Sequence, residues 1–124
     1  MSLSVKTRTS GIVAIVDLQG RITLGEPTGL LRDTVKSILA GGNKNILLNL
    51  GEVSYIDSAG LGELVGSYAT VTNMGGAIKL LHPQAKVHDL LQVTKLYTVF
   101  VAFDDEVEAL RSYASAAAGG HLYL

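Results

Sequence analysis

The stretch Val53-Ser54-Tyr55-Ile56-Asp57-Ser58-Ala59-Gly60-Leu61-Gly62 joins an apolar strand to the start of a helix. Before it, residues 46–50 (Ile-Leu-Leu-Asn-Leu) have the composition of a buried strand. After it, the residues that recur at the three-and-four spacing of an amphipathic helix are Leu61, Leu64, Val65, Tyr68, Ala69 and Thr72. The pattern therefore places Ser58 at or beside the N-cap of a helix.

Ser58 is the candidate functional residue of this junction. A helix N-terminus carries partial positive charge and free backbone N–H groups, so it favours an anion, including a phosphate on a serine hydroxyl. Gly60 and Gly62 remove side chains that would otherwise shield that hydroxyl. The simpler alternative is that Ser58 only caps the helix, as serine commonly does. For Asp57, the alternatives are that it orients the serine, contacts a partner or only completes the turn.

The composition excludes several classes of protein. A chain of 124 residues with 48% hydrophobic and 17% charged residues is long enough and apolar enough to fold as one domain. A net charge of −1 with scattered lysines and arginines disfavours nucleic acid as a partner. The absence of cysteine excludes disulfides and thiolate metal sites, and no apolar run has the length of a membrane span. We therefore expect a cytoplasmic protein that does not insert into membranes.

An enzyme would need a nucleophile with a base, paired carboxylates or a cluster of metal ligands, and the sequence is short of all three. His88-Asp89 lies far from Ser58 in the sequence and is typical of a solvated helix face. The Gly-x-Ser-x-Gly frame of serine hydrolases requires glycine at position 56, where this chain has Ile56. We expect no enzymatic activity, no cofactor and no metal.

The run of residues 50–62, with the core Asp-Ser-Ala-Gly-Leu-Gly at 57–62, resembles the signature of the STAS domain, the family of the bacterial anti-sigma factor antagonists. Residues 20–23 (Gly-Arg-Ile-Thr) resemble the Gly-x-Leu-Asp turn of that family. Residues 82–97 and 99–104 resemble its closing helix and strand and the start of its final helix. The likeness covers residues 4 to about 112.

The resemblance implies a phosphorylation-switched interaction module, with Ser58 as the phosphoacceptor. In such antagonists the unphosphorylated protein binds an anti-sigma factor, which is itself the serine kinase, and a serine phosphatase resets the switch. A phosphate would add about −2 charge beside Asp57 and repel a partner that recognises the neutral site. An alternative is a STAS subunit of a lipid-transport or stress-signalling complex that is never phosphorylated. Small-ligand binding has little support in the sequence.

The resemblance also implies a docking surface around Ser58. Its expected members are Asp57, Ala59, Gly60, Leu61 and Gly62. The neighbouring loop adds weaker candidates, namely Thr23, Leu24, Gly25 and Glu26, although Leu24 could instead belong to the edge of the core. Thr23 stands where the family often has aspartate, so a charge contact that the aspartate would offer to the partner is missing, and Arg21 makes the loop locally basic.

The predicted fold is α/β, with a mixed, mostly parallel sheet of about four to five strands and about four packed helices. An opening hairpin (4–8 and 12–18) precedes alternating helices and strands, of which the last strand is predicted at 98–103 and the last helix after a cap at Asp104. We expect a single STAS domain at 1–112 and a loosely ordered, small-residue tail at 113–124. A free edge strand leaves a monomer or a weak homodimer open.

Overall fold

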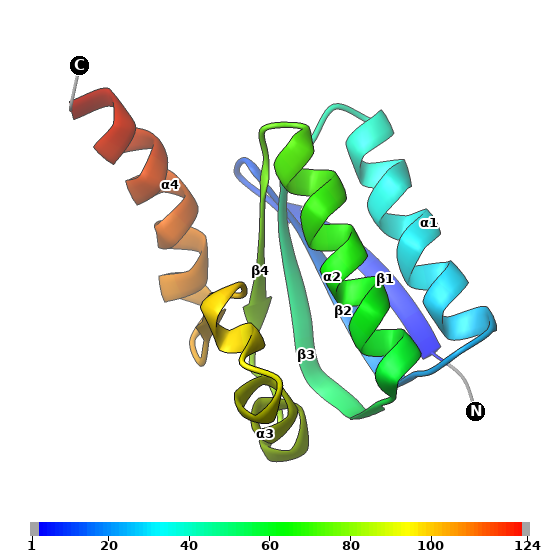
Figure 1. The fold of residues 1–124 in the computed structure, drawn as a ribbon. Coiled ribbons are helices and arrows are strands. Elements are labelled where there is room, and N and C mark those ends of the chain that lie inside the picture. The colour runs from blue at the N-terminus through cyan, green and yellow to red at the C-terminus, as the bar shows by residue number, and fades with distance from the viewer. Residues whose placement is uncertain (1–2, 123–124) are drawn as a thin grey trace.

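The computed structural model describes residues 3–122 and contains one sheet and four α-helices. In chain order the elements are β1 (Leu3–Ser10), β2 (Val13–Ile22), α1 (Glu26–Ala40), β3 (Asn45–Ile56), α2 (Ser58–Asn73), β4 (Ala77–Leu81), α3 (Ala85–Val93), the 3₁₀ turn η1 (Leu96–Thr98), β5 (Ala102–Phe103) and α4 (Glu106–Leu122). Figure 1 shows α1 and α2 side by side in front of the strands.

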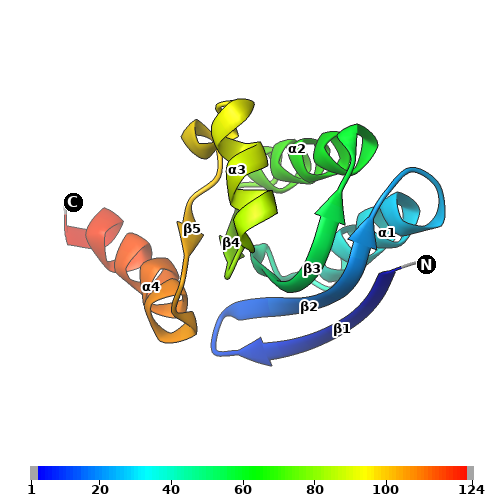
Figure 2. The same cartoon turned by 90° about the horizontal axis from the view of Figure 1, so that it is seen from below.

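The strands form a five-stranded sheet in the order β1-β2-β3-β4-β5 (Figure 2). Only the β1–β2 hairpin is antiparallel, while β2, β3, β4 and β5 pair in parallel. The mixed, mostly parallel sheet with four helices confirms the predicted fold class. Because β2 and β3 are parallel neighbours, their carboxyl ends reach the same edge of the sheet, and the predicted site lies there.

One face of the sheet carries the main hydrophobic core, which α1, α2 and α3 cover. The strands contribute Val16, Leu18, Ile46, Leu48, Leu50, Ile78 and Leu80, and the helices contribute Leu31, Val35, Leu39, Leu64, Val71, Val87 and Leu91. Leu64 and Val71 lie seven residues apart on α2 and are fully buried, whereas Val65 on the adjoining face is 37% exposed. The buried stripe of α2 is therefore narrower than its apolar sequence suggests.

The opposite face carries a smaller core under α4. Tyr113 and Ala109 of α4 pack with Val13, Ile15, Leu47 and Leu81. The Tyr113 hydroxyl donates to the backbone carbonyl of Ile46, and burial raises the pKa of Tyr113. Lys79 on β4 donates to the Ser112 hydroxyl at 2.8 Å and lies 4.6 Å from the Tyr113 ring. These contacts fasten α4 to the sheet.

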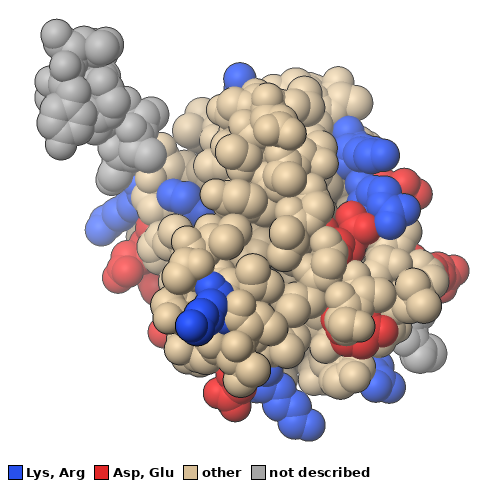
Figure 3. All heavy atoms as spheres, in the orientation of Figure 1, with Lys and Arg blue, Asp and Glu red and all other residues tan. Residues whose placement is uncertain are grey.

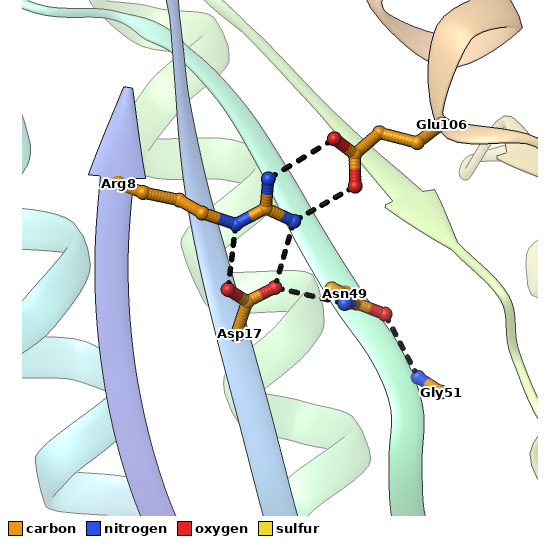
Figure 4. A network of polar contacts seen from close by, with 5 residues as sticks. All are labelled: Arg8, Asp17, Asn49, Gly51 and Glu106. Carbon is orange, nitrogen blue, oxygen red and sulfur yellow. Dashed lines mark hydrogen bonds and ion pairs between the residues drawn. The ribbon is translucent and has the colours of Figure 1, made fainter. Parts of the chain in front are cut away.

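A polar network joins α4 to the hairpin on the same face (Figure 4). Arg8 donates to both oxygens of Asp17 and of Glu106, with the shortest N–O distance in each pair 2.7 Å. Asn49 donates to Asp17 at 2.8 Å and accepts from the Gly51 N–H at 3.1 Å. These hydrogen bonds from Arg8 are the main cause of the lowered pKa values of Asp17 and Glu106. Three strands and the first turn of α4 are thus held together by charge-assisted hydrogen bonds.

The C-terminal part of the chain differs from the prediction in three details. Tyr113, assigned to the tail by its small-residue surroundings, is 3% exposed and belongs to the folded core. The last strand is shorter than predicted because Thr98 belongs to η1 and the backbone N–H groups of Val99 and Phe100 donate back to the Leu96 carbonyl; Phe100 lies in the main core. The cap of α4 is Asp105, which accepts from the Glu108 N–H at 2.9 Å, and not Asp104. The boundary at residue 112 otherwise stays a prediction, and residues 123–124 lie outside the described part.

Candidate partner-binding site at the start of α2

The site is formed where two strand-to-helix junctions lie side by side. β2 ends at Ile22 and leads through a loop to α1, and β3 ends at Ile56 and leads through Asp57 to α2. The Asp57 backbone N–H donates to the Ile22 carbonyl at 3.2 Å, which continues the strand pairing to the edge of the sheet. Residues from two loops, more than thirty positions apart in the sequence, therefore form one surface.

Asp57 is the N-cap of α2 and connects the two junctions. One carboxylate oxygen accepts from the Gly60 N–H at 2.7 Å, and the other accepts from the Leu24 N–H at 3.0 Å. The Gly60 hydrogen bond, followed by that from Leu24, lowers the pKa of Asp57, because both stabilise the charged carboxylate. Of the alternatives for this residue, the geometry favours completion of the turn, with the added task of holding the neighbouring loop.

Ser58 is the first residue of α2 and is exposed to solvent. Asp57 takes the capping role that was the simpler alternative for Ser58. Among the described residues the Ser58 hydroxyl has no hydrogen-bond partner, and the first turn of α2 contains no acidic residue. The hydroxyl is thus accessible at a positively polarised helix end, in a position where local folding does not require it.

The glycines of this turn have different surroundings. Gly60 is buried, and a Cβ at this position would lie 2.1 Å from the backbone carbonyl oxygen of Ile22. This corrects the expectation that Gly60 exposes the serine: Gly60 lets α2 approach β2 and offers no surface. Gly62 is exposed, with nothing within 4 Å of an added Cβ. Ala59 and Leu61 are half-buried, and Leu61 packs against the main core.

The β2–α1 loop forms the other side of the site. Leu24 is 77% exposed, so the idea that it belongs to the edge of the core is wrong. Gly25 has φ 109°, a conformation that favours glycine, and Glu26 is exposed in the first turn of α1. Thr23 is half-buried, and its carbonyl accepts from the Thr28 N–H at 3.3 Å. The loop therefore presents Leu24 and Glu26 to solvent beside Ser58.

Sequence reasoning did not select Tyr55 as a site residue. Its ring is 42% exposed although it lies between the buried Val53 and Ile56, and the Arg21 guanidinium lies 4.8 Å from the ring centroid. Strict alternation along β3 would place Tyr55 on the same face as the buried Val53, so the sequence pattern gave no signal for its exposure; the pairing of β2 with β3 shifts register between Gly20 and Arg21, beside this residue. A second contact nearby, the Arg32–Glu63 ion pair at 2.7 Å, joins α1 to α2.

Two further features were searched for in the described part of the chain. Among the side chains that the structure describes, residues 3–114, there is no group of three or more His, Asp or Glu arranged to hold a metal ion. None of the helices drawn between residues 3 and 122 combines the length and the apolar character needed to cross a bilayer.

Residues 4–109 match the model of the STAS domain family, which is most of the chain. The chain belongs to the STAS family. An anti-sigma F factor antagonist from Paenibacillus polymyxa is 27% identical over 110 residues, covering 89% of this STAS chain and 94% of the relative. The match extends over the site and both faces of the sheet.

Solved structures agree with this assignment. The crystal structure of a proposed anti-sigma factor antagonist from Thermotoga maritima has a TM-score of 0.81 at 27% identity, covering 87% of this STAS domain and 92% of that chain. The antagonist SpoIIAA in its unphosphorylated form has a TM-score of 0.69 at 17% identity, covering 90% and 98% of the two chains, and shows that the fold is shared. SpoIIAA has also been solved in a phosphorylated form, with a TM-score of 0.69 at 19% identity and a coverage of 89% and 99%.

Proposed function

We propose that this protein is a phosphorylation-switched anti-sigma factor antagonist, with Ser58 as the phosphoacceptor. The observation that carries the proposal is the Ser58 hydroxyl, which is exposed at the N-terminus of α2 while Asp57 performs the capping. A modification of Ser58 can therefore change the surface without removing the hydrogen bonds that hold the two loops. A switch residue needs this separation between folding and recognition.

The electrostatics of the site suit a charge switch. A phosphate on Ser58 adds about −2 charge directly beside the Asp57 carboxylate, while the partial positive charge at the N-terminus of α2 partly stabilises it. The Asp57 carboxylate is ionised at neutral pH, and the hydrogen bonds from the Gly60 and Leu24 N–H groups lower its pKa further below the usual value. Phosphorylation thus places two anionic groups next to each other on the surface, and a partner that fits the neutral hydroxyl must then desolvate both.

The exposed side of α2 provides a surface for docking next to Ser58. Gly62, Val65, Gly66 and Ala69 are exposed on α2, and α2 contains one charged residue, Glu63, which is paired with Arg32. In Figure 3 the middle of this face carries few charged side chains, and most of them lie around its margin. These exposed residues of α2 and Leu24 form an uncharged surface. Because most of their side chains are small, a partner can approach the helix closely.

The relatives indicate the class of partner. One relative is described as an antagonist of anti-sigma F factor, and SpoIIAA exists in both phosphorylated and unphosphorylated forms. By extension, the unphosphorylated protein binds an anti-sigma factor with serine kinase activity through Asp57, Ala59, Leu61, Gly62 and the Leu24 loop. Phosphorylation of Ser58 releases it, and a serine phosphatase restores binding. Because Thr23 stands where many family members have aspartate, this loop has one negative charge fewer than theirs.

Site-mapped mass spectrometry tests the switch directly. The protein is incubated with ATP and lysate of its native host, and phosphate is mapped in the wild type and in Ser58→Ala. We expect a phosphate on Ser58 that is absent from the variant. A spectrum without phosphate under several growth conditions would favour the alternative, a STAS subunit that acts without phosphorylation in a larger complex.

A titration with the anti-sigma factor then tests the consequence for binding. Ser58→Asp should weaken binding at least tenfold, because it adds a charge where the partner approaches. Ser10→Asp is the matched control, since it adds the same charge at the opposite end of the β1–β2 hairpin, where Ser10 pairs with Val13. Equal affinities for the two variants would contradict the proposal.

A further inference from the structure

We propose that a recess between the end of β3 and α3 receives an apolar side chain of the partner that has an acidic residue beside it. The inference rests on the proposed function, because it assumes a protein partner at Ser58, and it adds the chemistry of a second contact. The recess measures about 150 Å³ and is lined by Tyr55, Ile56, Lys86, Val87 and Leu90.

The size and lining of the recess suit one aliphatic or aromatic side chain. Sites for cofactors and drug-sized ligands measure about 300–1,000 Å³, so this recess is too small for such molecules. Ile56 and Val87 are buried and supply an apolar interior, whereas Tyr55 is 42% exposed and Leu90 is half-buried at its margin. An apolar side chain that enters the recess would remove these surfaces from water.

Two cations border the recess without an acidic partner in the described part of the chain. Lys86 lines it, and Arg21 stacks on the ring of Tyr55, which also lines it. Neither takes part in an ion pair among residues 3–122, whereas Arg8 and Arg32 both do. Stacking uses the face of a guanidinium and leaves its N–H groups free to donate, so both Arg21 and Lys86 remain available to pair with a carboxylate.

The recess is continuous with the proposed docking surface. Tyr55 and Ile56 directly precede Asp57 and Ser58, so the Cα atoms of Tyr55 and Ser58 are at most about 11 Å apart along the chain. A partner that covers Ser58 needs to extend only this far to place a side chain in the recess. This continuity and the two free cations favour an acidic, apolar segment of the partner as the occupant.

The test uses NMR with capped dipeptides and the full-length protein, so it needs neither the partner nor a phosphate. The probes are acetyl-leucyl-glutamic acid amide, acetyl-leucyl-lysine amide and acetyl-alanyl-glutamic acid amide. We expect the first to shift the amide signals of Tyr55, Ile56, Val87 and Leu90 with a dissociation constant of about 1 mM. The lysine probe should bind about two- to fivefold more weakly, because a surface ion pair contributes that much, and the alanine probe about tenfold more weakly.

Two pairs of variants locate the effect. Leu90→Phe should narrow the recess and remove the shifts, whereas Val93→Phe should keep them, because Val93 is on the same helix but is 81% exposed and does not line the recess. Lys86→Ala should remove most of the preference for the glutamate probe over the lysine probe. Lys36→Ala, on α1 and away from the recess, should leave that preference unchanged.

The outcomes separate this inference from the proposed function. Absence of shifts at about 20 mM probe, equal shifts in Leu90→Phe, or equal binding of the lysine and glutamate probes would overturn the inference. None of these results bears on whether Ser58 is phosphorylated. Conversely, a failure to find phosphate on Ser58 leaves a measured dipeptide preference standing as a property of the recess.

Discussion

Gly60 and Gly62 are two residues apart in the first turns of α2, yet they face opposite environments. A Cβ on Gly60 would lie 2.1 Å from the Ile22 carbonyl oxygen, and a Cβ on Gly62 would meet nothing within 4 Å. The inner side of this turn, with Asp57 and Gly60, therefore holds the structure, and the outer side, with Ser58 and Gly62, is free for recognition. Variants on the two sides should have effects of different size and, for the glycines, of opposite sign.

The largest effect is expected for Gly60→Ala. The new methyl group would collide with backbone, which cannot move aside like a flexible side chain, so α2 must shift away from β2. We expect a loss of about 3 kcal/mol or more in the free energy of unfolding, at the upper end of the range for overpacking. Urea denaturation with Gly62→Ala as the control measures this. A loss below about 1 kcal/mol would show that the contact between α2 and β2 is not tight.

The second effect is expected for Asp57→Asn, which keeps one capping oxygen but loses the charge and one of the two acceptors. Its destabilisation should be smaller than that of Gly60→Ala and should depend on pH. Because the folded pKa of Asp57 lies below its usual 3.8, its stabilisation is present above about pH 4 and is lost as the pH falls through the folded pKa. Urea denaturation at pH 7 and near pH 2 measures this. The difference in free energy of unfolding between the variant and the wild type should be smaller at the acid pH. A constant difference would mean that the carboxylate charge plays no part.

Gly62→Ala and Gly66→Ala should have smaller effects of the opposite sign. Both glycines lie inside α2 with open space around an added Cβ. Each substitution should raise the free energy of unfolding by about 0.5–1 kcal/mol, because glycine is a poor helix former.

The larger Gly62→Leu should instead weaken binding of the anti-sigma factor without unfolding the protein. Unchanged binding by Gly62→Leu would place the docking surface elsewhere.

The smallest effect on stability is expected for Ser58→Ala. The hydroxyl makes no hydrogen bond within residues 3–122 and Asp57 caps the helix, so the free energy of unfolding should change by less than about 0.5 kcal/mol. Thermal or urea denaturation checks this value. A loss of 1 kcal/mol or more would indicate that Ser58 shares the capping, and it would weaken the separation between the two sides of the turn.

Patterns within single segments predicted most of the fold. The apolar strand at 46–50, the helix after Pro27 and the Asp57-Ser58 junction all follow from local periodicity and from residues that start or stop helices. Tyr113 was missed because the small residues that follow it carry no helical period that would mark it as core. The role of Gly60 was misread because a glycine in a sequence does not reveal whether it is exposed or allows a close approach.

Contacts between distant segments could not be predicted in this way. The hydrogen bond from the Leu24 N–H to Asp57 joins residues 33 positions apart, and the recess joins Tyr55 to Leu90. The network of Arg8, Asp17 and Glu106 similarly connects the hairpin to α4. Each of these contacts depends on the order of the strands in the sheet. That order cannot be read from any single segment of the sequence.

The sequence by itself determined the family signature, the alternation of strands and helices and the position of Ser58 at a helix start, because these depend on residues within one or two turns of each other. Only the tertiary structure decided that Asp57 rather than Ser58 caps α2, that Gly60 faces a carbonyl while Gly62 faces solvent, and that Tyr55 joins α3 in a recess. The physical reason is that burial and hydrogen bonding at this site depend on the approach of β2, α1 and α3, and that approach is set by packing of the whole sheet.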